Sequence, residues 1–145
     1  ARTYIDHYFD RYRGVKAFID QTIEKARQEG RVSTEFGRIR YIPDINSKNA
    51  NMRGIAERAA VNTPIQGTAA DLLKMAMIRV DAALSEKGFK SAMLLTVHDE
   101  LVFEVPEDEV DALQELVRGI MEGIADLAVP LKVNVSVGRD WAAVH

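Results

Sequence analysis

Residues 92–105 read AMLLTVHDELVFEV. Two short apolar runs, residues 92–97 and 101–105, are separated by three polar residues, which are His98, Asp99 and Glu100. Apolar runs of this length around a short polar gap are typical of two antiparallel strands joined by a tight turn. We therefore expect a β-hairpin that presents three polar side chains at its exposed tip.

Helical patterns flank this hairpin on both sides. Before it, a helix is expected from Thr68, its predicted cap, to about Ser85, with an apolar stripe of Leu72, Met75, Ala76, Ala83 and Leu84. After it, Pro106 and three acidic residues suit the start of a helix that continues to about Ile124. Residues 131–137 then alternate in the manner of a strand.

The expected fold class is α+β. From Thr68 onward the order is helix, strand, strand, helix, strand, which is a split βαββαβ unit without its first strand. The absent strand would leave an open sheet edge, through which the chain could associate with itself. The sequence leaves its oligomeric state open.

Residues 1–66 precede this unit and form the other expected domain, with residues 67–145 as the second. Helices are expected over residues 2–12 and 14–29, with Gly30 ending the second one. Residues 31–35 and 38–42 flank Phe36-Gly37 and predict a small hairpin, followed by a polar loop over 46–51 and a helix over 52–63. Because proline lacks an amide donor and crowds the preceding turn, we expect that helix to end or bend near Asn62, and Gly67 to loosen the chain before the next.

The composition is that of a globular domain, since 47% of the 145 residues are hydrophobic and 28% are charged. The absence of cysteine excludes disulfides and thiolate metal sites, and no apolar run approaches the length of a membrane span. A cytoplasmic protein is the expectation. Residues 1–66 carry a net charge of +4 and residues 67–145 one of -7, so the first part is better suited to meet phosphates.

The turn residues 98–100 are candidates for metal chemistry. Adjacent strand residues point to opposite faces, so we expect one carboxylate, that of Asp99, to face a site. Mg²⁺ prefers oxygen ligands and is commonly held by one or two carboxylates plus substrate phosphates. Asp99 alone would bind it weakly until a partner carboxylate and a nucleotide arrived. The alternative is that all three are ordinary polar turn residues.

Three hydrogen-bond donors, Arg58, Asn62 and Gln66, stand four residues apart and would share one helical face, although Pro64 puts the last step in doubt. The minor groove offers acceptors at every base pair, so such donors could check pair geometry without reading sequence. The alternative is a solvated face with Arg58 paired to an acid such as Glu57. Basic side chains nearby could contact backbone phosphate, namely Arg38, Arg40, Lys48 and Arg53.

Two segments carry a resemblance to a known family. Residues 57–71, ERAAVNTPIQGTAAD, and residues 97–104, VHDELVFE, closely resemble family A DNA polymerases of the bacterial polymerase I type. The likeness covers essentially the whole chain. Two long motifs in the right order are far more specific than either one alone.

The resemblance implies a role for each candidate residue. Asp99 matches the palm aspartate of motif C that helps to hold two Mg²⁺ ions, Glu100 its acidic neighbour, and His98 a residue near the primer terminus. The donors match positions that touch the minor groove of the primer-template, and the loop with Lys48 and Arg53 lies on the template side. Deoxynucleoside triphosphates and primer-template DNA are the implied partners, in the nucleoid of a bacterial cytoplasm.

The same resemblance implies that residues 1–66 belong to the fingers side and residues 67–145 to the palm. In the family, a second metal-binding aspartate and the helix that grips the nucleotide come before the position of Ala1. The topological gap in the sheet agrees with this absence. We therefore expect residues 1–145 in isolation not to extend primers.

Two other classes of function stay open from the residues themselves. A non-catalytic nucleic-acid-binding module with a ferredoxin-like sheet would stack bases on sheet aromatics, but Phe103 is the one aromatic residue in the strands expected between 92 and 137. A metal-dependent nuclease would need several converging carboxylates, and the sequence offers the pair Asp99 and Glu100.

Overall fold

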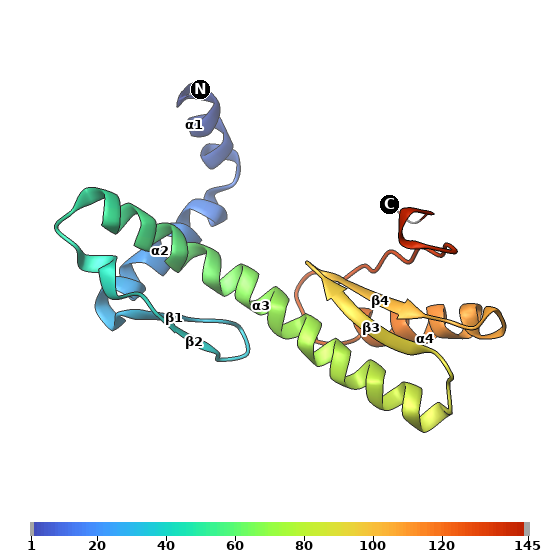
Figure 1. The fold of residues 1–145 in the computed structure, drawn as a ribbon. Helices are drawn as coiled ribbons and strands as arrows, with labels where there is room; N and C mark the ends of the chain where they lie inside the picture. The colour runs from blue at the N-terminus through green and yellow to red at the C-terminus, as the bar shows by residue number, and fades with distance from the viewer. Residues whose placement is uncertain (1, 144–145) are drawn as a thin grey trace. The chain divides into compact units, whose positions relative to one another are not determined.

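A computed structural model describes residues 2–143, which form helices and two small antiparallel sheets (Figure 1). The elements in chain order are α1 (Arg2–Arg11), α2 (Arg13–Glu29), β1 (Arg31–Ser33), β2 (Ile39–Tyr41), the 3-10 turn η1 (Pro43–Asn46), α3 (Ala50–Lys87), β3 (Ala92–Val97), β4 (Glu100–Glu104), η2 (Glu107–Glu109), α4 (Val110–Glu122) and η3 (Trp141–Ala143). The α+β class is confirmed. The chain divides into two compact units, residues 1–69 and residues 70–145.

Glycines end α2 and turn the first hairpin as the sequence predicts. Gly30 adopts a left-handed φ of 68°, and its N–H donates to the carbonyl of Ala26 over 2.8 Å. In the turn between β1 and β2, Gly37 has a φ of 82° and donates to the carbonyl of Thr34. Both positions favour glycine, because residues with a side chain rarely adopt positive φ. The hairpin pairs Val32 with Arg40.

The first unit has a small apolar core. Its buried residues come from α2, the hairpin, η1 and the first part of α3, and they are Ala26, Val32, Ile42, Ile45, Ala56 and Ala60. Alanine dominates on the two helices, so their backbones can approach closely. Figure 1 accordingly shows α2 and the β1–β2 hairpin beside the first part of α3.

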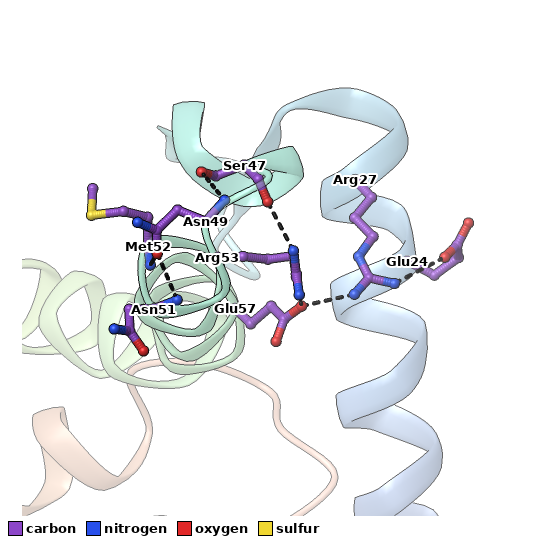
Figure 2. A network of polar contacts seen from close by, with 8 residues as sticks. All are labelled: Glu24, Arg27, Ser47, Asn49, Asn51, Met52, Arg53 and Glu57. Carbon is purple, nitrogen blue, oxygen red and sulfur yellow. Dashed lines mark hydrogen bonds and ion pairs between the residues drawn. The ribbon is translucent and has the colours of Figure 1, made fainter.

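The start of α3 differs slightly from expectation. The helix begins at Ala50, two residues early, because Asn49 caps it. The Asn49 side-chain oxygen accepts hydrogen bonds from the backbone N–H groups of Asn51, at 2.9 Å, and Met52, at 3.3 Å (Figure 2). An asparagine directly before a helix satisfies amides that have no partner within it. The expected polar loop is therefore short, since η1 extends to Asn46.

The prediction that the chain breaks at Pro64 is wrong. One helix of 38 residues, α3, passes through both Pro64 and Gly67. Thr68 is not a cap either, because it lies inside α3 and its hydroxyl accepts a hydrogen bond from the N–H of Glu35. The physical reason is tertiary: the β1–β2 hairpin contacts α3 before and after Pro64, and these contacts favour helix where local propensity does not.

The second unit packs a hairpin and a helix against the end of α3. β3 and β4 pair antiparallel with Val97 opposite Glu100, and Leu94 forms a bulge in β3. The core consists of residues from α3 and α4, with Phe103 of β4 packed against it; the buried ones are Val80, Leu84, Leu113 and Val117. The expected hairpin and the expected helix after it are both confirmed.

Two expectations for this unit need correction. Pro106 does not open α4, because residues 107–109 form the turn η2 first and α4 starts at Val110. Residues 131–137 also form no strand, although their exposure alternates up to residue 136. In a split βαββαβ unit the last strand pairs with the first one. The described residues contain no first strand with which residues 131–137 could form backbone hydrogen bonds.

Within the described residues, no helix is both long and apolar enough to cross a membrane.

Candidate functional site

The β3–β4 turn holds His98 and Asp99 between the paired residues Val97 and Glu100. A two-residue turn between twisted strands requires positive φ, and His98 supplies it with a φ of 54°, a rare conformation for a residue with a side chain. His98 and Asp99 are exposed, as is Glu100, the first residue of β4. The hairpin therefore exposes the Asp99 carboxylate to solvent at a turn between two paired strands, as the sequence predicts.

The oxygen atoms of Asp99 suit a share in a Mg²⁺ site. No group of three or more histidine, cysteine, aspartate or glutamate side chains gathers anywhere between residues 2 and 143 in a way that could enclose an ion. Mg²⁺ does not need such an enclosure, since it commonly keeps waters and binds one or two carboxylates together with substrate phosphates. The exposed turn fits that open kind of site.

The donors Arg58, Asn62 and Gln66 lie along one face of α3. Because α3 is continuous through Pro64, each step of four residues turns the helix by only about 40° beyond a full turn. All three side chains are exposed. The doubt that Pro64 raised about the last step is thereby removed, and the structure brings the three donors into one row.

Glu57 does not pair with Arg58, which was the alternative explanation for that arginine. Its carboxylate lies 2.7 Å from an amino group of Arg27 on α2 and 3.9 Å from Nε of Arg53 (Figure 2). None of the hydrogen bonds and ion pairs found among the described residues involves the side chains of Arg58, Asn62 or Gln66. The row therefore faces solvent with its donors available.

Arg53 and Lys48 differ in how they are held. The Arg53 guanidinium is half-buried and donates to the carbonyl of Ser47 over 2.9 Å, so it ties the loop before α3 to the helix (Figure 2). Lys48 is exposed in that loop. Of the two, Lys48 has the accessible charge, whereas the contacts of Arg53 are those of a structural residue.

Arg38 and Arg40 also contact α3. Arg38 Nη2 donates to the Gly67 carbonyl over 2.9 Å, and Arg40 Nη1 donates to the Thr63 hydroxyl over 3.1 Å. Arg38 and Gly67 are 29 positions apart in the chain, and Arg40 and Thr63 are 23 positions apart. No local sequence pattern could therefore have indicated these contacts. Sequence reasoning named both arginines only as candidates for phosphate contact and missed this arrangement.

Comparison with known proteins identifies the family. Residues 1–143 match the family described as DNA polymerase family A. This chain belongs to DNA polymerase family A. The family assignment agrees with the motifs over residues 57–71 and 97–104.

Among the family A relatives, DNA polymerase I of Lactococcus lactis subsp. lactis (strain IL1403) is 51% identical over 141 residues, covering 97% of this chain and 16% of that protein. DNA polymerase I of Bacillus subtilis (strain 168) is 48% identical over 141 residues, with the same coverage of each chain. The chain thus spans about a sixth of the length of these curated relatives.

A solved family A structure is also similar to this chain. It is the POL domain of Pol1 from M. smegmatis in complex with DNA primer-template and dNTP, with a TM-score of 0.95 and 48% sequence identity. The match covers 99% of this chain and 25% of that one. The turn residues belong to the second unit and the donor row to the first.

Proposed function

We propose that this chain is the part of a bacterial DNA-directed DNA polymerase that carries one metal-binding carboxylate and one contact surface for primer-template DNA. The reaction is attack of the primer 3′ hydroxyl on the α-phosphate of a deoxynucleoside triphosphate, with pyrophosphate as the leaving group. The exposed Asp99 carboxylate at the tip of the β3–β4 hairpin carries the proposal.

Asp99 is proposed to hold Mg²⁺ together with a carboxylate from another part of the enzyme. Two such ions, when bound, lower the pKa of the hydroxyl nucleophile and neutralise charge on the phosphates. The hairpin holds Asp99 in place, since the strands on both sides are paired. Glu100 adds negative charge beside it, and His98, at the same tip, is placed to meet the primer terminus.

The donor row on α3 is proposed to lie along the minor groove of the primer-template. Residues four apart on a helix are about 6 Å apart along its axis, close to two base-pair steps of about 3.4 Å each. Because every base pair presents minor-groove acceptors, Arg58, Asn62 and Gln66 could thus meet acceptors at about every second base pair. Lys48, in the loop before α3, is the proposed contact on the template side, and Arg53, proposed from the sequence for the same side, is proposed to act by holding that loop.

The partners are proposed to be primer-template DNA and deoxynucleoside triphosphates. The similar M. smegmatis domain was solved with both, which supports this choice. We assign residues 1–66 to the fingers side and residues 67–145 to the palm. The place of action is the nucleoid in the bacterial cytoplasm, where such a substrate is found.

The test uses the full-length polymerase that contains this chain, with incorporation of a labelled nucleotide as the readout. Asp99→Ala should lower kcat about 10³-fold or more, because loss of a metal ligand removes several kcal/mol of charge stabilisation in the transition state. Asp108→Ala is the matched control, since Asp108 is an exposed carboxylate in η2 of the same unit. Full activity in Asp99→Ala would refute the proposal.

Residues 1–145 alone are expected not to extend primers. The non-catalytic binding module would instead be favoured by two results together. The chain would bind duplex DNA without preference for a recessed 3′ end, and Asp99→Ala would leave that binding unchanged.

A further inference from the structure

Pro64 lies in the interior of α3. Proline has no N–H, so the carbonyl four residues before it, that of Ala60, loses its usual helical donor, and the ring crowds the preceding turn. Such positions commonly kink or end a helix. α3 nevertheless continues for more than twenty residues beyond Pro64.

The β1–β2 hairpin is hydrogen-bonded to α3 on both sides of Pro64. Before it, Arg40 donates to the hydroxyl of Thr63 over 3.1 Å, and that hydroxyl donates to the carbonyl of Ala59 over 2.7 Å. After it, Arg38 donates to the Gly67 carbonyl and the N–H of Glu35 donates to the Thr68 hydroxyl, both over 2.9 Å. The hairpin therefore bridges the turn of α3 that Pro64 weakens.

The hairpin also packs so closely against α3 that Gly67 has to be glycine. A Cβ atom on Gly67 would lie 2.7 Å from the Cγ2 methyl of Thr34, which is shorter than any relaxed contact. Thr34 cannot easily move, because it is 5% exposed and its hydroxyl accepts a hydrogen bond of 3.1 Å from the N–H of Arg38. Adding one methyl group to Gly67 would push the hairpin and α3 apart.

The residues that the hairpin contacts stand directly beside the donor row. Thr63 follows Asn62 and Gly67 follows Gln66, so the two rows are about 100° apart around the helix. A shift or bend of α3 at Pro64 would move Gln66 relative to Asn62 and Arg58. The contacts with the hairpin therefore fix the spacing within the row.

We propose that the β1–β2 hairpin positions the donor row of α3 for primer-template DNA by holding the helix continuous across Pro64, with Thr34, Arg40, Thr63 and Gly67 as positioning residues. This inference rests on the proposed function of the row. None of these four residues has to touch DNA itself. They act on binding through the geometry of Arg58, Asn62 and Gln66.

The first test measures the Kd of the full-length polymerase for a primer-template. Gly67→Ala should raise the Kd at least about 5-fold, since overpacking of this kind displaces backbone. Adding Thr34→Ser should restore most of the affinity, because serine keeps the hydroxyl that accepts from Arg38 but lacks the methyl group. Gly14→Ala in α2 is the matched control, since nothing lies within 4 Å of a Cβ atom at that glycine.

The second test is a double-mutant cycle that does not depend on a buried substitution. Arg40→Ala should raise the Kd about 3- to 10-fold, as expected for loss of the part-buried hydrogen bond to Thr63. Asn62→Ala should then cost less affinity in the Arg40→Ala background than in the wild type, because the row is already misplaced. Fully additive effects would contradict a positioning role.

The outcomes separate this inference from the proposed function. If Asn62→Ala leaves the Kd unchanged, the row does not bind DNA and both ideas are wrong. If Asn62→Ala weakens binding but Gly67→Ala and Arg40→Ala do not, the row keeps its function and only the positioning role of the hairpin is overturned. Failure of Thr34→Ser to restore Gly67→Ala would also overturn it.

Discussion

The hydroxyl of Ser91 donates a hydrogen bond of 2.6 Å to the carboxylate of Glu109, which joins the start of β3 to the turn before α4. The backbone N–H groups of Lys90 and Ser91 donate to the same carboxylate. These hydrogen bonds hold the pKa of Glu109 below its usual value of 4.5. The bond from the Ser91 hydroxyl has the largest effect, and the bond from the Lys90 N–H comes next. An ionised acceptor is therefore part of the native structure of the second unit.

The first prediction concerns pH. Because the folded-state pKa of Glu109 lies below the unfolded value, its carboxylate stabilises the fold above about pH 4.5, and this contribution is lost as the pH falls through the folded-state pKa. Glu109→Gln should thus lower the free energy of unfolding at pH 7, and its difference from the wild type should shrink below pH 4.5. Urea titrations at several pH values measure this.

Glu107→Gln serves as the control for that series, because Glu107 is exposed in the same turn and its side chain makes no hydrogen bond to another described residue. A gap between the wild type and Glu109→Gln that stays constant from pH 7 to pH 3 would contradict the assignment.

The second prediction concerns the start of α3. Asn49→Ala should lower the free energy of unfolding by about 1 kcal/mol, since the N–H groups of Asn51 and Met52 lose their acceptor. Asn51→Ala is the matched control: it places alanine in the first turn but leaves the capping oxygen intact. Chemical denaturation of the three proteins gives the comparison, and equal stability of all three would show that Asn49 is not the cap that matters.

The third prediction concerns Pro64. Since α3 is helical on both sides of this residue, Pro64→Ala restores a donor for the Ala60 carbonyl and removes a steric conflict. The free energy of unfolding should rise by about 1 kcal/mol or more, less than the full helix-interior penalty because proline also restricts the unfolded chain. A midpoint in urea below that of the wild type would mean that the ring packs favourably against the hairpin.

The fourth prediction concerns the donor row. Asn62→Ala and Gln66→Ala should each raise the Kd of the full-length polymerase for primer-template about 3- to 10-fold, with little dependence on base sequence. Fluorescence anisotropy with two primer-templates of different sequence is the measurement. Gln21→Ala, an exposed amide on α2, should not change the Kd. A loss confined to one of the two sequences would contradict the minor-groove assignment, because the groove's acceptors are shared by all base pairs.

Local sequence signals predicted much of the fold. Gly30 ends α2, Phe36-Gly37 turns the first hairpin, and residues 98–99 turn the second. Each of these depends on a few neighbouring residues, since a left-handed glycine or a short polar gap between apolar runs acts within one turn. The exposed position of Asp99 follows from the second hairpin directly. Its role in binding metal stays a prediction, as do the roles of the donors on α3.

The sequence by itself determined the family, the α+β class and the presence of Asp99 at the turn of a hairpin, because these depend on motifs and on contacts between near neighbours. Tertiary structure decided what happens at Pro64 and over residues 131–137. At Pro64, hydrogen bonds from Arg38 and Arg40 outweigh the local tendency of proline to break a helix. Residues 131–137 alternate like a strand but have no adjacent strand to pair with, and a strand exists only where its backbone groups find a partner.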